Sequence, residues 1–286
     1  MTIPCPGEGL NFSAHFCERV RRAQTAAVVA ALAAPVPLRH LGAMTSRWAL
    51  VTGAGKRLGT GIARALAHRG FDIIAHVNES LRGAEVLRAE LEGLGRRVEV
   101  IRADIATVEG QDDLVRRAKA LTNSLAVIVH NAGIFERKPF HEIDREAYAR
   151  MQAVHTEAPF FITQGLLAEL RADPSPCIVH VTDIAAERPI AAYAHYAVSK
   201  AGLVMLTRAL AVELAPHIRV NGVAPGTVLF PDDFDAETRA RFLARIPLRR
   251  EGRAADVAAA VVFLVADAPY VTGHIIAVDG GRSCSL

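Results

Sequence analysis

The sequence predicts one α/β domain built on a doubly wound parallel sheet, with helices on both faces. Short apolar runs alternate with longer helical patterns from Met44 to the end of the chain. Strands that are separated by helices pair in parallel through right-handed crossovers. The runs are almost continuously apolar, which is typical of strands buried on both faces. Because the alternation contains neither a repeat nor a linker, residues 44–286 are expected to form a single domain.

The order of the expected elements follows from this alternation, in which each helix separates two strands. The apolar runs predict strands at Trp48–Val51, Phe71–Val77, Val98–Arg102, Ala126–Val129, Cys177–Val181, Arg219–Val223 and Ile275–Val278. Helical periodicity predicts helices at Gly59–His68, Leu81–Leu94, Val108–Leu121, Asp144–Leu170, Tyr193–Ala215 and Ala254–Val265.

Residues 1–43 have a different character, with scattered prolines, two cysteines and an Ala-rich run. We expect them to be a disordered extension, or the result of a start codon chosen upstream of Met44. The Ala-rich run, Ala26–Ala34, is nine residues long and is stopped by Pro35. A membrane span needs about 20 apolar residues, so the sequence predicts no membrane-spanning segment.

Composition and charge narrow the class of protein. Of 286 residues, 51% are apolar and 22% are charged, as in soluble globular domains. The formal net charge is +3, and no basic face indicates nucleic-acid binding. The four cysteines, Cys5, Cys17, Cys177 and Cys284, show no CxxC spacing, which fits a reducing cytoplasm. With only scattered histidines besides, the sequence offers no candidate metal site.

The loop after the first expected strand is a candidate nucleotide site. It reads Thr52-Gly53-Ala54-Gly55-Lys56-Arg57-Leu58-Gly59, and its glycines permit a tight turn and close approach of the backbone to a pyrophosphate. Ligands of doubly wound sheets bind beyond the carboxyl ends of the strands. The same edge carries Asp104, which can accept a hydrogen bond from an adenine amino group or cap a helix, and Asn131-Ala132-Gly133.

Tyr196 and Lys200 begin the helix after the fifth strand, four residues apart and therefore on one helical face. A cation beside a phenol favours the phenolate, so the pKa of Tyr196 is expected to lie below its usual value of about 10. Tyr196 would then be a usable general acid near neutral pH.

These motifs, in this order, resemble the short-chain dehydrogenase/reductase family, whose fold is Rossmann-like. The resemblance covers 44–286 and includes the segments 221–226 and 278–281. It implies a nicotinamide cofactor and hydride transfer, with Tyr196 as the acid and Lys200 holding the ribose. It also implies a homo-oligomer, commonly a tetramer built on the helices 144–170 and 193–215. The implied cofactor contacts are Gly53, Lys56, Arg57, Leu58, Gly59, His76, Asn78, Ser80, Asp104, Ile105, Asn131, Ala132, Gly133, Tyr196, Lys200, Pro225, Gly226 and Val228.

Three departures from the common family pattern narrow the substrate. Arg57 stands where most members have glycine, Asp183 takes the position of the usual catalytic serine, and His155 replaces the helix asparagine of the proton relay. The first two departures resemble the pteridine reductases and the bacterial dihydromonapterin reductases, as do the segments 151–155 and 228–231. An aromatic residue stacks on the pterin in that subgroup, and Phe135 occupies its position.

The resemblance therefore implies a pterin between the nicotinamide and Phe135, with Arg57 near its oxygen and the cofactor phosphates. Asp183, Tyr196 and Lys200 are then the catalytic residues, and Arg57, Phe135, Asp183 and Tyr196 contact the substrate. A carboxylate can accept from the N–H groups of a pterin while it hydrogen-bonds the phenol, and it opposes the phenolate. Gly133 is a mismatch, because the parasitic pteridine reductases have serine there.

NADPH is favoured over NADH as the cofactor. NAD-preferring relatives carry an acidic residue at the end of the second strand, where this chain has Val77. Lys56 and Arg57 offer two cations to a 2′-phosphate. Glu79 lies two residues after Val77, so a contact between its carboxylate and the ribose hydroxyls of NADH is the alternative.

Two other functions remain open from the sequence. One is reduction of a carbonyl, as in the 3-oxoacyl-carrier-protein reductases, against which Asp183 argues. The other is a non-catalytic NADP(H)-binding regulator, against which the intact pair of Tyr196 and Lys200 argues.

Overall fold

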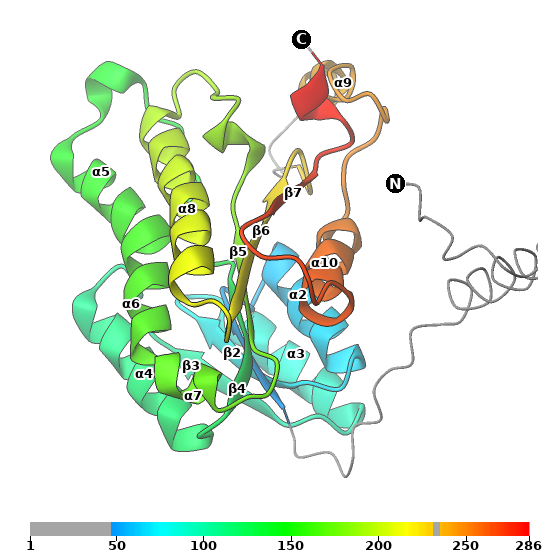
Figure 1. Ribbon diagram of the computed structural model, residues 1–286. Coiled ribbons are helices and arrows are strands. Elements are labelled where there is room, and N and C mark those ends of the chain that lie inside the picture. The colour runs from blue at the N-terminus through cyan, green and yellow to red at the C-terminus, as the bar shows by residue number, and fades with distance from the viewer. Residues whose placement is uncertain (1–46, 231–234, 286) are drawn as a thin grey trace, which may run out of the picture. The chain divides into compact units, whose positions relative to one another are not determined.

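Seven parallel strands form one sheet in the computed structural model, which describes residues 47–230 and 235–285 (Figure 1). The strand order is β3-β2-β1-β4-β5-β6-β7. It reverses between β1 and β4, and a doubly wound sheet binds ligands at the carboxyl edge beside such a reversal. The strands are β1 (Trp48–Thr52), β2 (Asp72–Val77), β3 (Val98–Arg102), β4 (Leu125–His130), β5 (Cys177–Val181), β6 (Arg219–Pro225) and β7 (Ile275–Val278).

The predicted doubly wound α/β fold is confirmed, together with all seven expected strands. Four inner strands, β1, β2, β4 and β5, are buried along their whole length, and alternate side chains face the two helical layers. In β1, Ala49 and Val51 pack on one side, and Trp48 and Leu50 pack on the other. The strand ends lie within two residues of the expected ones.

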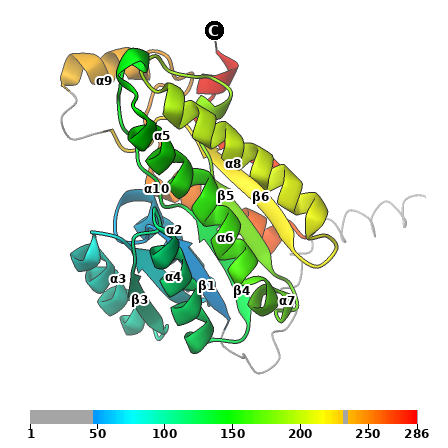
Figure 2. The same ribbon diagram turned by 90° about the vertical axis from the view of Figure 1, so that its left-hand side faces the viewer.

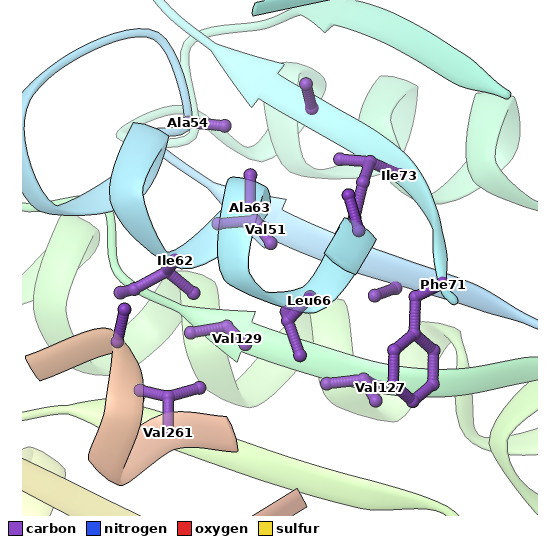
Figure 3. Close-up of a cluster of buried hydrophobic side chains, with 14 of the residues drawn as sticks. Val51, Ala54, Ile62, Ala63, Leu66, Phe71, Ile73, Val127, Val129 and Val261 are labelled. Carbon is purple, nitrogen blue, oxygen red and sulfur yellow. The ribbon is translucent and has the colours of Figure 1, made fainter. Parts of the chain in front are cut away.

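Helices cover both faces of the sheet (Figures 1 and 2). Figure 3 shows part of one layer, where Ile62 and Leu66 of α2 lie beside Val129 of β4 and Val261 of α10. Burial of this apolar surface is the main favourable term in folding. This layer contains α2 (Arg57–His68), α3 (Leu81–Gly93) and α10 (Ala254–Val262), and the opposite layer contains α4 (Val108–Leu121), α6 (Ala158–Gly165) and α8 (Ala194–Glu213).

The single helix expected over 144–170 is wrong, because the segment is a broken run. α5 (Arg145–Gln152) passes into a π-helical turn, η2 (Ala153–Glu157), which is followed by α6 and α7 (Leu167–Arg171). Pro159 has no N–H to donate to the preceding turn, which favours a local change of the hydrogen-bond pattern. The π turn carries His155 into the interior.

A helix that the sequence analysis did not predict, α9 (Ala236–Leu243), lies between β6 and α10. The Asp235 side chain caps it by accepting the N–H of Thr238 at 2.6 Å, and an acidic N-cap is a signal that sequence can supply. The expected helix over 254–265 ends at Val262 and continues as a π turn, η4 (Phe263–Asp267). Short 3-10 turns are η1 (Phe140–Glu142), η3 (Ile184–Ala186) and η5 (Arg282–Cys284).

The expectation for residues 1–43 lies outside the described residues. Among the helices that are described, none has the length and apolar character needed to cross a membrane.

Candidate active site

The loop between β1 and α2 is a close crossing of backbone segments. Gly53 has a φ of +68°, and a Cβ on it would lie 2.9 Å from the Cα of Ala132. A Cβ on Gly59 would lie 2.0 Å from the carbonyl oxygen of Gly53. Neither position has room for a side chain, and the first also has a conformation that favours glycine. The glycine spacing in the sequence therefore reflects tight packing around the point where the strand order reverses.

Thr52, which sequence reasoning missed, ties the end of β1 to the end of β4. Its hydroxyl oxygen accepts the backbone N–H of Asn131 at 2.9 Å and that of Ala132 at 3.0 Å. The Asn131 side-chain amide donates in return to the Thr52 carbonyl oxygen at 2.9 Å. The glycine loop and the 131–133 segment are thus one hydrogen-bonded unit. A threonine directly before the first glycine was the available signal.

The ring of His76, one of the predicted cofactor residues, contacts the glycine loop itself. The ring is buried, and its Nδ1 accepts the N–H of Gly53 at 3.3 Å. Its Nε2 then carries the proton and donates to the carbonyl oxygen of Ala103 at 3.1 Å. Burial lowers the pKa of His76 to about 4, so the ring is neutral. The ring therefore fixes Gly53 of the glycine loop to Ala103 after β3 through these two hydrogen bonds.

The first turn of α2 is suited to a phosphate. The Lys56 side chain at the N-cap makes no capping hydrogen bond, so the first backbone N–H groups are available to an anion. Arg57, the next residue, has a φ of +51°. Its guanidinium donates to the carbonyl oxygen of Leu229 in the segment after β6. These features of the loop and helix fit a dinucleotide, and Arg57 connects the nucleotide loop to the substrate end.

The end of β2, where a ribose would lie, has an unexpected basic neighbour. Val77 is buried, and Glu79 is exposed. Arg102 of β3 pairs in register with Val77, and its Nε donates to the carbonyl oxygen of Asn78 at 3.1 Å. Sequence reasoning missed Arg102, because only the pairing of β2 with β3 brings it to this corner. Ser80 packs on the glycine loop, where a Cβ on Gly55 would lie 2.5 Å from its hydroxyl.

The remaining predicted cofactor residues lie along the same carboxyl edge. Asp104 uses one carboxylate oxygen to accept the N–H of Ala106 at 3.1 Å, so it does cap a turn. Gly226 follows β6 and packs against Asp279, from which a Cβ would lie 2.6 Å away. The other members of this group are Leu58 in α2, Ile105 after β3, Gly133 after β4, Pro225 at the end of β6 and Val228 beyond it.

Asp183, Tyr196 and Lys200 come together beyond β5. The Tyr196 hydroxyl donates to the Asp183 carboxylate at 2.8 Å, and the other oxygen of Asp183 accepts the N–H of Ala185 at 2.7 Å. Lys200 is buried, and its Nζ donates to the carbonyl oxygen of Val181 at 3.0 Å and lies 5.8 Å from the Tyr196 ring centroid. Asp183 begins η3 and the other two residues lie on the first turns of α8, so β5 and α8 fix the group.

The electrostatics of this group correct the expectation of a lowered tyrosine pKa. Burial and the adjacent Asp183 carboxylate raise the pKa of Tyr196 well above its usual value. Burial also raises the pKa of Asp183, and burial lowers that of Lys200 to about 8. The phenol is therefore protonated at neutral pH, as a proton donor must be.

A family model described as enoyl-(acyl carrier protein) reductase matches residues 53–283. The chain belongs to the short-chain dehydrogenase/reductase family. It is accordingly an oxidoreductase of the nicotinamide-dependent type.

Relatives in the family carry varied names. The cis-4-hydroxycyclohexanecarboxylate dehydrogenase of Sinomonas cyclohexanicum is 37% identical over 244 residues, which cover 84% of this chain and 97% of that protein. The dihydromonapterin reductase of Enterobacter sp. (strain 638) is 33% identical, covering 85% of this chain and 99% of that protein. A crystal structure of blue fluorescent protein from a metagenomic library in complex with NADPH superimposes with a TM-score of 0.78, at 32% identity, over 85% of this chain and 99% of that one.

His155 belongs to a buried hydrogen-bond chain in this short-chain dehydrogenase/reductase. Its Nε2 accepts the N–H of Ile134 at 3.2 Å, so Nδ1 carries the proton and donates to the Ser199 hydroxyl at 2.8 Å. That hydroxyl donates to the carbonyl oxygen of Tyr196 at 2.7 Å. Burial, with the charge of Lys200, lowers the pKa of His155 well below its usual range. The neutral ring has both nitrogens engaged, so it positions α8 rather than relaying a proton.

The same ring accounts for Gly133. A Cβ on Gly133 would lie 3.0 Å from His155 Nε2, which leaves no room for the serine of the parasitic pteridine reductases without a shift.

Phe135 presents an aromatic surface beside the catalytic tyrosine. Its ring stacks on Tyr193 with centroids 4.4 Å apart and meets Tyr196 edge-on at 4.9 Å. Its side chain nevertheless remains 57% exposed. Aromatic pairs in these geometries fix one another in place, so Phe135 offers a rigid apolar surface.

Proposed function

We propose that the chain is an NADPH-dependent reductase of a 7,8-dihydropterin, such as dihydromonapterin or dihydrobiopterin, and forms the tetrahydropterin. The observation that carries the proposal is the 2.8 Å hydrogen bond from the Tyr196 phenol to Asp183. A ketone reductase needs a neutral hydroxyl donor at that position, whereas a pterin presents N–H groups that a carboxylate accepts.

Each catalytic residue then has a definite part in the reduction. NADPH, when bound, would supply the hydride for C6 of the dihydropterin, while N5 would take up a proton. Asp183 anchors the N–H edge of the ring and orients the phenol of Tyr196. Lys200 and Tyr196 would hold the nicotinamide ribose, and the proton for N5 would come from the phenol or from a water near Arg57.

Two further observations support a flat heteroaromatic substrate. Phe135 is exposed at the reacting end and is braced by Tyr193, as a surface for stacking must be. A relative that is 33% identical over nearly its whole length carries the name dihydromonapterin reductase.

NADPH is the preferred cofactor in this proposal. Lys56 and Arg57 are exposed at the loop, and Arg102 lies next to Asn78 at the corner where a 2′-phosphate would bind. Val77, at the usual position of the acid, offers nothing to ribose hydroxyls.

We also propose that the chain acts as a homo-oligomer, most simply a tetramer, in the cytoplasm. α6 and α8 lie side by side on the outer surface (Figure 2) and expose Phe160, Phe161 and Met205. Exposed apolar residues on adjoining helices are typical of subunit interfaces. Light scattering of the purified protein measures the assembly.

The experiment that tests the function is a panel of NADPH oxidation assays with dihydromonapterin, dihydrobiopterin, dihydrofolate and an acetoacetyl thioester. We expect turnover with at least one dihydropterin and a loss of about 10²-fold or more in Tyr196→Phe. Turnover of the thioester alone would make the chain a carbonyl reductase. NADPH binding without turnover of any of these substrates would favour the alternative of a non-catalytic NADP(H)-binding regulator.

A further inference from the structure

Arg57 joins the nucleotide loop to a segment that is distant in sequence. It is the first residue of α2, and its guanidinium donates to the carbonyl oxygen of Leu229, which follows β6. β6 pairs with β5, and Asp183 lies two residues beyond the end of β5. The side chain of Arg57 therefore spans from the cofactor end of the carboxyl edge to the segment that leaves the sheet beside the catalytic group.

Leu229 belongs to a junction that is formed by residues 227–230 and residues 251–252. The N–H of Gly252 donates to the carbonyl oxygen of Thr227 at 3.0 Å, and the N–H of Leu229 donates to the carbonyl oxygen of Gly252 at 3.4 Å. Between the two parts of the junction, the chain carries α9. The junction is thus the base from which the chain leaves the sheet toward α9 and to which it returns.

Unusual backbone conformations mark the same place. Arg57 and Leu229 have φ values of +51° and +56°, and Arg249, just before the second part of the junction, has a φ of +53°. Residues other than glycine stay in the left-handed region only where their surroundings hold them, and such residues cluster at functional sites. The hydrogen bond from Arg57 to Leu229 links two of these positions.

The junction also reaches α2 by a second route. Gly252 lies two residues before Ala254, the first residue of α10, and α10 packs along α2 (Figure 1). A Cβ on Gly61 of α2 would lie 3.0 Å from the Cβ of Ala254. Contacts therefore run in a closed circuit from α2 through Arg57, Leu229 and Gly252 to α10 and back to α2. A circuit of this kind can carry a change at the first turn of α2 to the junction.

Arg57 keeps further donors for a phosphate at that turn. A guanidinium carries five N–H groups, and the contact with Leu229 uses Nη2. The first N–H groups of α2 suit an anion, because the Lys56 side chain at the N-cap makes no capping hydrogen bond. The exposed side chain of Arg57 begins at the same turn. Its planar fork can therefore hold a phosphate oxygen and the Leu229 carbonyl oxygen together.

We infer that Arg57 is a positioning residue that bridges a cofactor phosphate and the Leu229 carbonyl, so that cofactor binding and the junction stabilise each other. The inference rests on the nicotinamide cofactor and is independent of which substrate is reduced. Coupling of this kind is reciprocal, so the factor by which bound cofactor stabilises the junction is also the factor by which the intact junction tightens the cofactor. One charge-assisted hydrogen bond corresponds to about tenfold.

The first arm of the test measures amide hydrogen exchange in the full chain without cofactor. Arg57→Met keeps the apolar stem and removes the donors, so the N–H groups of Leu229 and Gly252 should exchange about tenfold faster. Arg57→Lys should recover part of the protection. Lys56→Gln is the matched control, since it removes the neighbouring cation and keeps Arg57, and it should leave these rates within about twofold. Equal rates in wild type and Arg57→Met would overturn the tie.

The second arm tests the coupling from the far side, by calorimetry with NADP⁺. A Cβ on Gly252 would lie 2.7 Å from Cγ2 of Val228, so Gly252→Ala loosens the junction. The variant should weaken NADP⁺ binding up to about tenfold when Arg57 is present, and within about twofold in the Arg57→Met background. Gly93→Ala, where no atom lies within 4 Å of the new Cβ, should leave the affinity unchanged. Equal losses in both backgrounds, or no loss in either, would overturn the coupling.

The two proposals fail separately in these experiments. Coupling that depends on Arg57, in a chain that reduces no dihydropterin, would uphold the bridge and remove the pterin proposal. Turnover of a dihydropterin without the coupling would do the reverse.

Discussion

The nucleotide end and the catalytic end of this site are held together by different means. At the nucleotide end backbones touch directly, since a Cβ on Gly59 or on Gly83 would lie 2.0 Å from a carbonyl oxygen of the loop. At the catalytic end side chains form the contacts, through hydrogen bonds from Tyr196 to Asp183 and from His155 to Ser199. The first end has no room for an added atom, whereas the second is defined by which polar groups face one another.

This difference explains where the family can vary. A backbone crossing accepts glycine and little else, whatever substrate is used. A hydrogen-bond network accepts a new side chain wherever donors and acceptors still match, as His155 does beside Gly133. Changes of substrate are therefore expected at the catalytic end, and relatives of this chain carry names as different as dehydrogenase and dihydromonapterin reductase.

The largest expected effect comes from replacing Asp183, which should impair catalysis at one end of the site and leave cofactor binding at the other end intact. Asp183→Ser removes the carboxylate that orients the phenol and anchors the ring, so kcat/KM for the dihydropterin should fall about 10²-fold or more. The affinity for NADPH should stay unchanged, because Asp183 lies away from the glycine loop. Steady-state kinetics and NADPH titration measure both quantities. Wild-type activity on an acetoacetyl thioester, with none on any dihydropterin, would contradict the role of Asp183.

The contrast between backbone contacts at the nucleotide end and side-chain contacts at the catalytic end also determines how much of the fold and the site the sequence predicts. The strands and the glycine loop were predictable because burial and backbone crowding leave periodic apolar runs and spaced glycines. Asp183 and Tyr196 were found from their spacing, but the direction of the tyrosine pKa was wrong, since it depends on burial that only packing determines. Arg102 reaches the corner of the site beside Asn78 through the pairing of β2 with β3, which no local pattern encodes.

The next effect tests whether a side chain at the nucleotide end selects the cofactor. Arg57→Gly should raise the KM for NADPH by about 10- to 100-fold and that for NADH much less, because one charge-assisted bond to a phosphate is lost. Folding should not suffer, since glycine suits the φ of +51° at this position better than arginine does. Kinetics with both cofactors and a melting curve give the comparison. Equal effects on the KM for NADPH and the KM for NADH would mean that Arg57 contacts the pyrophosphate or the substrate and not the 2′-phosphate.

A smaller effect tests the backbone crossing itself. Gly59→Ala should lower the free energy of unfolding by about 1–3 kcal/mol and weaken NADPH binding, because the new methyl group meets the Gly53 carbonyl oxygen. Gly93→Ala is the matched control, since no atom lies within 4 Å of its Cβ position at the end of α3. The control should be neutral or more stable by about 0.5–1 kcal/mol. Denaturant titration of both variants decides the point, and equal stabilities would show that the crossing yields easily.

The smallest expected effect is a shift of pH dependence at the catalytic end. The Asp183 carboxylate raises the pKa of Tyr196, and reduction needs the protonated phenol, so wild-type activity should persist through the alkaline range. Asp183→Asn removes that charge, which lowers the pKa of Tyr196 and moves the alkaline loss of the variant's residual activity to lower pH.

On the acid side, burial raises the pKa of Asp183 above its ordinary value. Wild type should therefore lose its orienting carboxylate, and with it activity, as pH falls through that raised pKa, whereas the variant should show no such acid loss. Profiles of kcat/KM for the two proteins separate these outcomes. Superimposable profiles would mean that the charge of Asp183 does not act on the phenol, and that its contact with Tyr196 is only a matter of shape.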